Sequence, residues 1–135
     1  MFFSTKMYLG RIITADGAFS RGRGLQFGAL SRPDKSLLFM VDIDMTFTKE
    51  LMANILKNTK HGQAYMPVIF SQYKTRQSLD DHFLITDRQG FWRSYGYGMV
   101  SIFKEDFEKS GGYDQDIVGW GMEDIKFCDQ LLKEK

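Results

Sequence analysis

Two carboxylates at the end of an apolar run are the side chains of this sequence best suited to chemistry. Asp42 and Asp44 follow five consecutive apolar residues, 37–41, and only Ile43 stands between them. A charge at the end of a buried strand is costly without a partner, so each carboxylate should meet solvent, a basic residue or a metal ion. Carboxylate oxygens suit Mg²⁺ or Mn²⁺, whereas zinc prefers histidine and cysteine. In an extended segment, residues i and i+2 point the same way, so both carboxylates can face one cation bound to a diphosphate.

The position of this pair favours a ligand site, although the spacing alone does not require one. In open α/β sheets, ligands bind beyond the carboxyl ends of the strands, which is where Asp42 and Asp44 are expected. The Asp-x-Asp pattern is also common by chance, usually as solvated turn residues. A metal site and a solvated loop are therefore both open.

A tryptophan between two glycines marks the second candidate site, in the stretch GGYDQDIVGWGMEDIKF of residues 111–127. Local structure fixes such a ring poorly, so Trp120 is either buried in the core or a platform on which a sugar ring stacks. Glu123 and Asp124 follow, in the expected first turn of the last helix. Carboxylates there stabilise the helix macrodipole by a few tenths to about 1 kcal/mol, so both could simply start the helix.

The third candidate site is the stretch FSRGRGLQFG, residues 19–28. Phe19, Arg21 and Arg23 stand at an expected turn into a helix, where arginine side chains and backbone N–H groups can bind phosphate. Solvated surface arginines are the commoner explanation of such a pattern. The stretch thus offers an anion site without requiring one.

The elements that must position these residues alternate between strand and helix. Apolar runs predict strands over residues 11–14, 36–41, 64–70 and 95–103. Helical spacing and capping residues predict helices over residues 19–30, 49–58, 104–109 and from 124 onward, with N-caps at Ser20 and Thr48. Residues 71–89 are expected to form a polar loop. The uninterrupted run 37–41 is typical of a strand buried on both faces of a parallel sheet, and the alternation predicts an α/β fold.

Composition sets outer limits on the function. With 135 residues, 43% of them hydrophobic and 26% charged, the chain has the make-up of one globular domain. A net charge of +1 gives no reason to expect nucleic acid as a partner. The single cysteine, Cys128, excludes an internal disulfide and is expected in the core. No apolar run approaches the roughly 20 residues of a membrane span.

The chain resembles, over nearly its whole length, the C-terminal glycosyltransferase domain of chondroitin sulfate synthases. It is more distantly similar to the β1,4-galactosyltransferases and the chondroitin N-acetylgalactosaminyltransferases. The resemblance is carried, in chain order, by FSRGRGLQFGA, LLFMVDIDMTFT, PVIFSQY and HFLITDRQGFWRSYGYGMVSIFKEDFEKSGGYDQDIVGWGMEDIKF. Their order makes it specific, because Asp-x-Asp is common whereas GWGxED preceded by GGYD is not.

The resemblance implies a Rossmann-like GT-A fold, a nucleotide-sugar donor and an inverting transfer that depends on Mn²⁺ or another divalent cation. Asp44 then corresponds to the direct metal ligand, and Asp42 to a residue that binds the nucleotide or a metal-bound water. Phe19 and Arg21 match positions that hold the nucleotide. Trp120 matches a tryptophan that contacts both the donor and the acceptor sugars.

The resemblance also assigns the residues nearest the acceptor. Glu123 matches an acceptor-binding carboxylate and Asp124 the general base, which takes the proton of the attacking hydroxyl while the metal neutralises the departing diphosphate. The implied donor is UDP-GalNAc and the implied acceptor a glucuronate-ended chondroitin chain. The alternative is a non-catalytic partner subunit of the same fold. Because the chain keeps both the Asp-x-Asp and the Glu-Asp pairs, an enzyme is favoured.

Two departures from the family pattern indicate a partial catalytic domain over residues 1–135, with the GT-A fold incomplete at both ends. The family has strands ahead of residue 11, and a histidine metal ligand on a strand beyond the last helix; His61 and His82 match neither its position nor its context. Met122 stands where many relatives carry glycine, which favours the synthase branch. The resemblance implies that the parent protein is a single-pass type II membrane protein with this domain in the Golgi lumen, and that a related synthase or polymerising-factor subunit is its partner.

Overall fold

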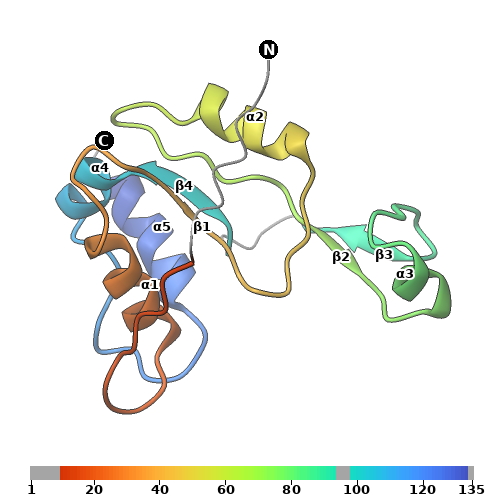
Figure 1. Cartoon of the computed structure of the whole chain (residues 1–135), viewed down its shortest axis with the longest axis horizontal. Helices are drawn as coiled ribbons and strands as arrows, with labels where there is room; N and C mark the ends of the chain where they lie inside the picture. Colours follow the sequence, from red (N-terminus) through yellow and green to blue (C-terminus); the bar gives the residue numbers. More distant parts are fainter. Residues whose placement is uncertain (1–9, 94–97, 134–135) are drawn as a thin grey trace.

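The structure, a computed structural model, describes residues 10–93 and 98–133 (Figure 1). The helices are α1 (Arg21–Leu30), α2 (Lys49–Asn58), α3 (Arg76–Asp80), α4 (Lys104–Lys109) and α5 (Glu123–Lys133). The strands are β1 (Leu37–Met40), β2 (Phe70–Gln72), β3 (Gly90–Trp92) and β4 (Val100–Phe103). The predicted mixture of helices and strands is therefore confirmed.

The core lies against the β1–β4 sheet. The two strands pair antiparallel, which places Leu38 opposite Ile102 and Met40 opposite Val100. All four side chains are buried, and they pack against apolar residues of α1, α4, the α4–α5 connection and α5: Ala29, Phe107, Tyr113 and Phe127. Burial of this apolar surface fixes the end of β1, which Asp42 follows, relative to the start of α5.

The prediction that β1 is buried on both faces of a parallel sheet is wrong. β1 pairs antiparallel with β4, and Leu37 and Phe39 are only half-buried, in alternation with buried neighbours. Successive side chains of a strand point to opposite faces, and the helical core covers only one face of β1 fully. An apolar run predicts that a strand forms, but it does not predict the partner strand, which depends on distant residues such as those of β4.

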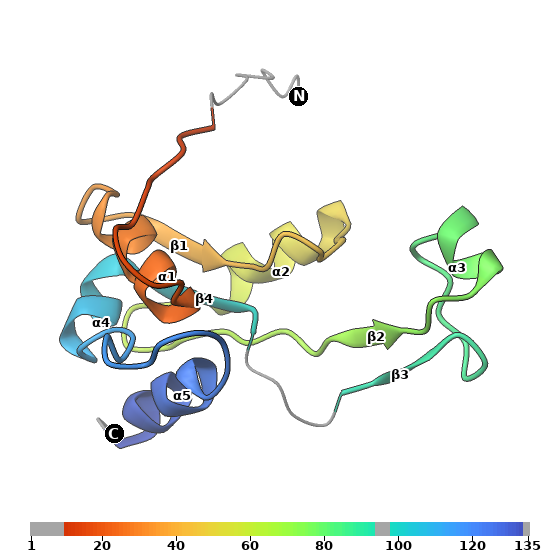
Figure 2. The same ribbon diagram turned by 90° about the horizontal axis from the view of Figure 1, so that it is seen from below.

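A second two-stranded sheet forms an arm, residues 70–93, that projects away from the β1–β4 sheet (Figures 1 and 2). β2 and β3 pair antiparallel with Ser71 opposite Phe91. Gly90 is required at this pairing, because a Cβ there would collide with the carbonyl oxygen of Ser71 and the ring of Phe70. The close approach of the two strands thus depends on the absence of a side chain.

The predicted polar loop over residues 71–89 is wrong, because this stretch contains most of β2 and all of α3. Thr75 caps α3: its hydroxyl accepts the N–H of Ser78, and the Ser78 hydroxyl accepts the N–H of Thr75. This reciprocal cap satisfies donors at the start of a helix that is too short to be stable alone. Its signal in the sequence was a threonine followed three residues later by a serine.

Three further strand predictions need correction. Residues 11–14 form no strand, and Ile12 is 95% exposed. Residues 64–69 are irregular, as expected around a proline that cannot donate to a ladder, and only Tyr65 forms a bridge, with Ser101 of β4. The strand predicted over 95–103 is observed as β4, from Val100, and residues 95–97 of that prediction lie outside the described residues.

The four predicted helices are confirmed to within two residues at their observed ends. Ser20 caps α1, since its hydroxyl oxygen accepts the N–H of Arg23 at 3.2 Å. Thr48 occupies the N-cap of α2, but its side chain makes no capping hydrogen bond. Cys128 is buried on α5, as predicted.

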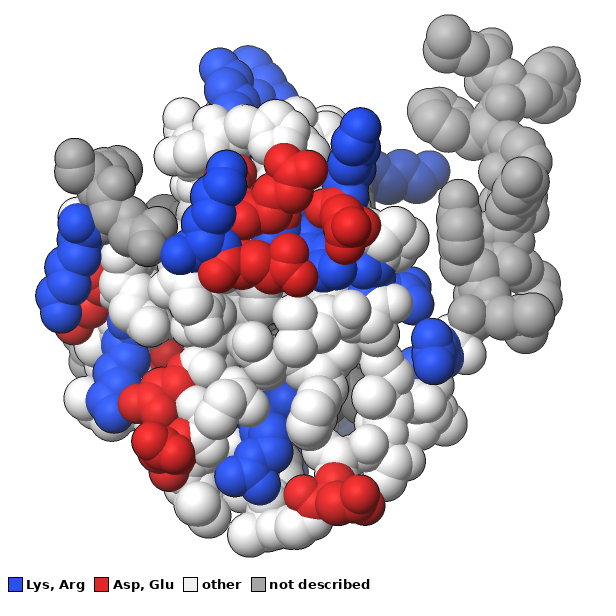
Figure 3. Space-filling view, turned by 90° about the vertical axis from the view of Figure 1, so that its left-hand side faces the viewer, with Lys and Arg blue, Asp and Glu red and all other residues white. Residues whose placement is uncertain are grey.

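The helices of the described ranges include none long and apolar enough to cross a membrane. Figure 3 shows one face of the molecule, on which acidic and basic side chains are intermixed. This mixture agrees with the net charge of +1.

Candidate functional site

A cavity of about 480 Å³ brings together five of the seven residues predicted to bind substrate or metal or to catalyse transfer. Phe19 lies just before α1 and Arg21 is its first residue. Asp42 and Asp44 come from the segment after β1, and Trp120 from the loop before α5. Cavities of this size commonly hold small molecules. Three segments that are far apart in the sequence thus meet around one cavity.

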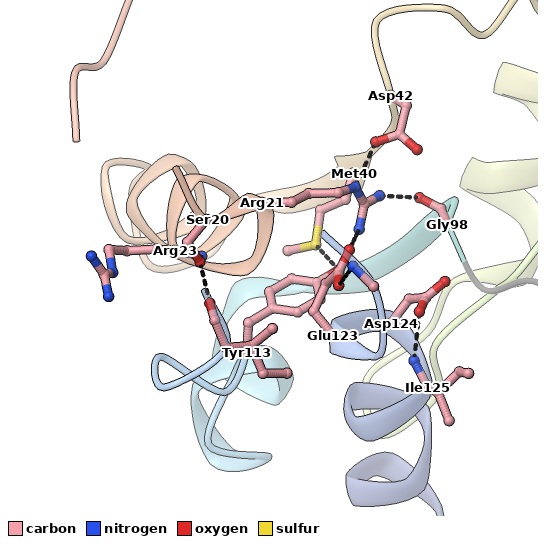
Figure 4. Close-up of polar contacts among 12 residues, drawn as sticks. Ser20, Arg21, Arg23, Met40, Asp42, Gly98, Tyr113, Glu123, Asp124 and Ile125 are labelled. Atoms are coloured by element: carbon pink, nitrogen blue, oxygen red, sulfur yellow. Dashed lines mark hydrogen bonds and ion pairs between the residues drawn. The ribbon is translucent and has the colours of Figure 1, made fainter. Parts of the chain in front are cut away.

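Arg21 joins these segments through hydrogen bonds (Figure 4). Its Nε donates to Asp42 Oδ1 at 2.8 Å, its Nη1 to Glu123 Oε1 at 3.1 Å, and its Nη2 to the carbonyl oxygen of Gly98 at 3.2 Å. The side chain is 10% exposed, so Arg21 is not a solvated surface arginine. We call Arg21, Asp42 and Glu123 the arginine clamp, because they tie α1, the segment after β1 and α5 together.

The charges of the clamp stabilise one another. Burial by itself lowers the pKa of Arg21, but the hydrogen bond and negative charge of Asp42, together with the hydrogen bond to Glu123, outweigh it, so the pKa is raised. Beside the clamp, burial raises the pKa of Tyr113, whose hydroxyl donates to the sulfur of Met40 at 3.3 Å. Arg21 is therefore charged and Tyr113 neutral near pH 7.

Glu123 faces inward from the first turn of α5. One carboxylate oxygen accepts from Arg21, and the other accepts the N–H of Gly121 at 2.6 Å. The residue is 2% exposed. In this arrangement both oxygens are engaged within the protein, so the carboxylate predicted to bind the acceptor is not open to solvent.

Trp120 lies on a loop whose backbone is fixed at both ends. Gly119 and Gly121 have φ angles of +89° and +113°, which glycine adopts without strain. Gly119 also accepts the N–H of Arg21 at 3.0 Å and donates to the carbonyl oxygen of Phe19 at 2.7 Å. Trp120 is 77% exposed, which excludes the buried alternative and leaves the ring available as a platform.

The two aspartates differ in their surroundings. Ile43 and Asp44 form a turn, in which Met45 donates its N–H to the carbonyl oxygen of Asp42 at 3.3 Å, so the expected extended path is wrong. Asp42 meets a basic residue, Arg21, whereas Asp44 is exposed. Both still line the same cavity. Asp44 is therefore the carboxylate most available to a cation.

The described residues include no group of three or more histidine, cysteine, aspartate or glutamate side chains placed to hold a metal ion. Mg²⁺ and similar ions, however, are commonly held by one or two carboxylates together with substrate phosphates and water. An exposed Asp44 beside a cavity fits that kind of donor set. His61 stacks on Phe103 at 4.0 Å between ring centroids, away from this cavity.

Asp124 lies outside the lining of the cavity, whereas Arg93, which was not predicted, forms part of it. Asp124 follows Glu123 on α5, outside the cavity lining, and its Oδ1 accepts the N–H of Ile125 at 2.8 Å. Arg93, which lines the cavity, was missed. Its signal was a basic residue directly after the aromatic pair Phe91 and Trp92.

Arginine, carboxylates and an exposed tryptophan around one cavity are side chains typical of small-molecule sites in proteins. Comparison with family models identifies the family: the chain belongs to the chondroitin N-acetylgalactosaminyltransferase family, whose model matches residues 4–135. The residues that surround the cavity all lie within this match.

Several curated proteins are similar to the chain. Human chondroitin sulfate synthase 3 is 37% identical over 128 residues, which cover 90% of this chain and 14% of that protein. Human chondroitin sulfate N-acetylgalactosaminyltransferase 1 is 39% identical over 131 residues, 89% of this chain and 25% of that protein. Mouse N-acetyl-beta-glucosaminyl-glycoprotein 4-beta-N-acetylgalactosaminyltransferase 1 is 30% identical over 121 residues, 87% and 11% of the two chains. The chain thus spans at most about a quarter of these relatives. No solved structure matches it.

Proposed function

We propose that the chain is part of the catalytic domain of an inverting glycosyltransferase with a GT-A fold. The enzyme would transfer N-acetylgalactosamine from UDP-GalNAc to a glucuronate-ended chondroitin chain. Family membership and the names of the relatives support this reaction class. The observation that carries the proposal is the cavity that gathers Arg21, Asp42, Asp44 and Trp120.

In this proposal each side chain has one task at the cavity. The exposed ring of Trp120 stacks on the donor and acceptor sugars, and Phe19, 71% exposed at the cavity wall, packs against the nucleotide. Asp44 would hold a divalent cation, Mn²⁺ in the first instance, and the chemistry supplied by that ion would be neutralisation of the diphosphate charge. Asp42 orients the nucleotide or a water, with its own carboxylate fixed by Arg21.

The metal assignment is tested by binding of UDP. In a protein that carries this chain within the complete catalytic domain, UDP and Mn²⁺ should bind together. Asp44→Asn should abolish this coupling, because a direct anionic ligand is lost, and Asp42→Asn should only weaken it. Isothermal titration of UDP with and without Mn²⁺ measures both effects. UDP binding that is indifferent to Mn²⁺ and to Asp44 would contradict the metal assignment.

Asp124 is the proposed general base. Its Oδ1 accepts a backbone N–H, so we assign the proton of the acceptor hydroxyl to Oδ2. Asp124→Asn keeps the size of the side chain but removes the proton acceptor, so turnover should fall by about 10² or more while UDP binding survives. Steady-state kinetics with UDP-GalNAc and a glucuronate-ended oligosaccharide measure the loss.

The alternative for Asp124 is a purely structural role at the start of α5. That role predicts nearly normal turnover and an earlier thermal transition for Asp124→Asn. A different result would favour the alternative function. If the wild-type protein that carries this chain within the complete catalytic domain binds UDP but transfers no sugar, the chain would belong to a non-catalytic partner subunit.

We also propose that the parent protein is a single-pass type II membrane protein that carries this domain in the Golgi lumen. Protease protection in intact Golgi vesicles tests this location. Digestion of the domain without detergent would contradict it.

A further inference from the structure

A second cavity, of about 510 Å³, adjoins the candidate site. The two cavities share five lining residues, among them Asp44, Ile69 and Arg93. The second cavity then continues toward the arm, where Phe83 and Trp92 line it. Its two walls come from the loop after β1 with the start of α2, and from the arm. A ligand bound beside Trp120 therefore has a continuous path past Asp44 and Arg93 to Trp92.

The second cavity is lined by several large apolar side chains that are exposed to solvent. Phe47, Phe83, Ile85 and Trp92 are each between 42% and 57% exposed, although they are large and apolar. Exposed aromatic side chains that gather around one hollow mark a ligand or partner site more often than scattered ones do. Trp92 is held in place by an edge-on contact with Phe70, at 5.2 Å between ring centroids. Its other surface is available for stacking on a flat ligand.

Arg93 supplies a positive charge where the two cavities meet. Its Nε donates to the Ser71 hydroxyl at 2.6 Å, which orients the guanidinium, and the residue is exposed. Within the described residues, its Nη nitrogens have no hydrogen-bonding partner. A planar guanidinium of this kind binds a carboxylate through two parallel hydrogen bonds. The junction therefore suits a ligand that carries carboxylates along its length.

We propose that this second cavity binds the inner sugars of an acidic acceptor chain, behind the end sugar that reacts beside Trp120. Trp92 and Phe83 stack on sugar rings, and Arg93 binds a uronate carboxylate. The inference rests on the proposed function, because it takes the acceptor class from it. As a subsite for the inner sugars, the second cavity would make binding depend on the length of the acceptor chain, because residues of the arm contact sugars behind the reacting end. The site beside Trp120 alone would recognise only that end.

Oligosaccharide length tests the proposal directly. Isothermal titration compares a trisaccharide and a heptasaccharide of chondroitin, both with glucuronate at the reacting end, on the protein that carries this chain in its complete catalytic domain. The heptasaccharide should bind at least about tenfold tighter to the wild type, as one additional stacking and ionic contact allows. In Trp92→Ala the ratio of the two affinities should fall toward one, and in Phe83→Ala it should fall in part.

The matched control is Phe91→Ala. Phe91 precedes Trp92 on β3, is similarly exposed at 51%, and lies on the opposite face, beside Tyr73. The wild-type affinity ratio should be kept in this variant. Because Trp92 also packs on Phe70, Phe83→Ala keeps the test decisive if Trp92→Ala fails to fold.

The other possible results of the binding experiment contradict either the subsite or the proposed function. Equal affinity of both oligosaccharides for the wild type, or an unchanged ratio in the Trp92 and Phe83 variants, overturns the subsite while leaving the proposed function intact. No binding of either oligosaccharide overturns the acceptor class and hence the proposed function. If Arg93→Gln weakens UDP binding and leaves the length ratio unchanged, Arg93 serves the donor diphosphate and its role in the subsite is overturned.

Discussion

Arg21 is the side chain on which the geometry of the candidate site depends most. Replacing it with lysine keeps the charge but cannot reproduce three separate bonds to Asp42, Glu123 and the carbonyl oxygen of Gly98. Because one ammonium group cannot take the place of all three donors, Glu123, at 2% exposure, would lose its charge-assisted hydrogen bond inside the protein. Because Asp42 is 39% exposed, the loss should lie near the lower end of the range for a broken buried ion pair, about 3 kcal/mol.

Urea denaturation of Arg21→Lys measures this loss. Arg23→Lys on the same helix is the control, because Arg23 makes a single exposed bond, to the carbonyl oxygen of Gln115 at 3.3 Å. The control should lose less than about 0.5 kcal/mol. Equal denaturation midpoints for Arg21→Lys and the wild type would mean that the clamp does not hold the site together.

At the residue scale the sequence predicted which side chains gather, but not how they pair. Asp42 was expected to meet solvent, a base or a metal, and the choice of Arg21 depended on contacts between distant segments. Glu123 was matched to an acceptor-binding role, whereas the structure buries it. Met122, noted only as a departure from glycine, has a φ angle of +69° and continues the left-handed backbone of Gly119 and Gly121.

At the scale of elements, helices were more predictable than strands. The helices α1, α2 and α4 have local signals, such as the cap at Ser20 and the helical spacing of 49–58. The arm has none of comparable strength: β2 and β3 are three residues each, and their pairing joins residues about 20 apart. Strands this short form only when they pair with each other, and the local sequence carries little sign of that pairing. The pattern over residues 71–89 therefore suggested a loop.

One ion pair between elements makes stability depend on pH. The Lys104 side chain at the start of α4 donates to Asp34, in the turn before β1, at 2.9 Å. This bond holds the pKa of Asp34 below its usual 3.8 and raises the pKa of Lys104. A carboxyl group with a lowered pKa adds stability at pH values above its unfolded pKa, and that stability is lost as the pH falls through the folded pKa.

Asp34→Asn should therefore be less stable than the wild type at pH 6, with the difference vanishing as the pH falls below 3.8. Urea midpoints at pH 6, 4 and 2.5 follow the change. In a Lys104→Met background the Asp34 substitution should have no effect, which isolates the pair. A difference between Asp34→Asn and the wild type that is as large at pH 2.5 as at pH 6 would show that Asp34 acts through something other than its charge.

For the whole molecule, the sheet arrangement was the part that sequence reasoning could not reach. Alternating elements predicted a parallel sheet, and the described strands pair only as two separate antiparallel ladders. Pairing between β1 and β4 brings together residues 60 or more apart, and no local signal encodes it. The same arrangement divides the molecule into a core around the β1–β4 sheet and an arm, residues 70–93 (Figure 2).

This division predicts an uneven distribution of stability. In β4, Val100, Ser101 and Ile102 are at most 1% exposed, whereas Phe91 and Trp92 of β3 are more than half exposed. Local opening is easiest where few apolar contacts are lost, so amides of the β2–β3 ladder should exchange with deuterium at least about tenfold faster than those of the β1–β4 ladder. Native-state hydrogen exchange followed by mass spectrometry measures both ladders in one sample. Equal protection would mean that the arm unfolds only together with the core, and the arm could then not adjust independently to a ligand in the second cavity.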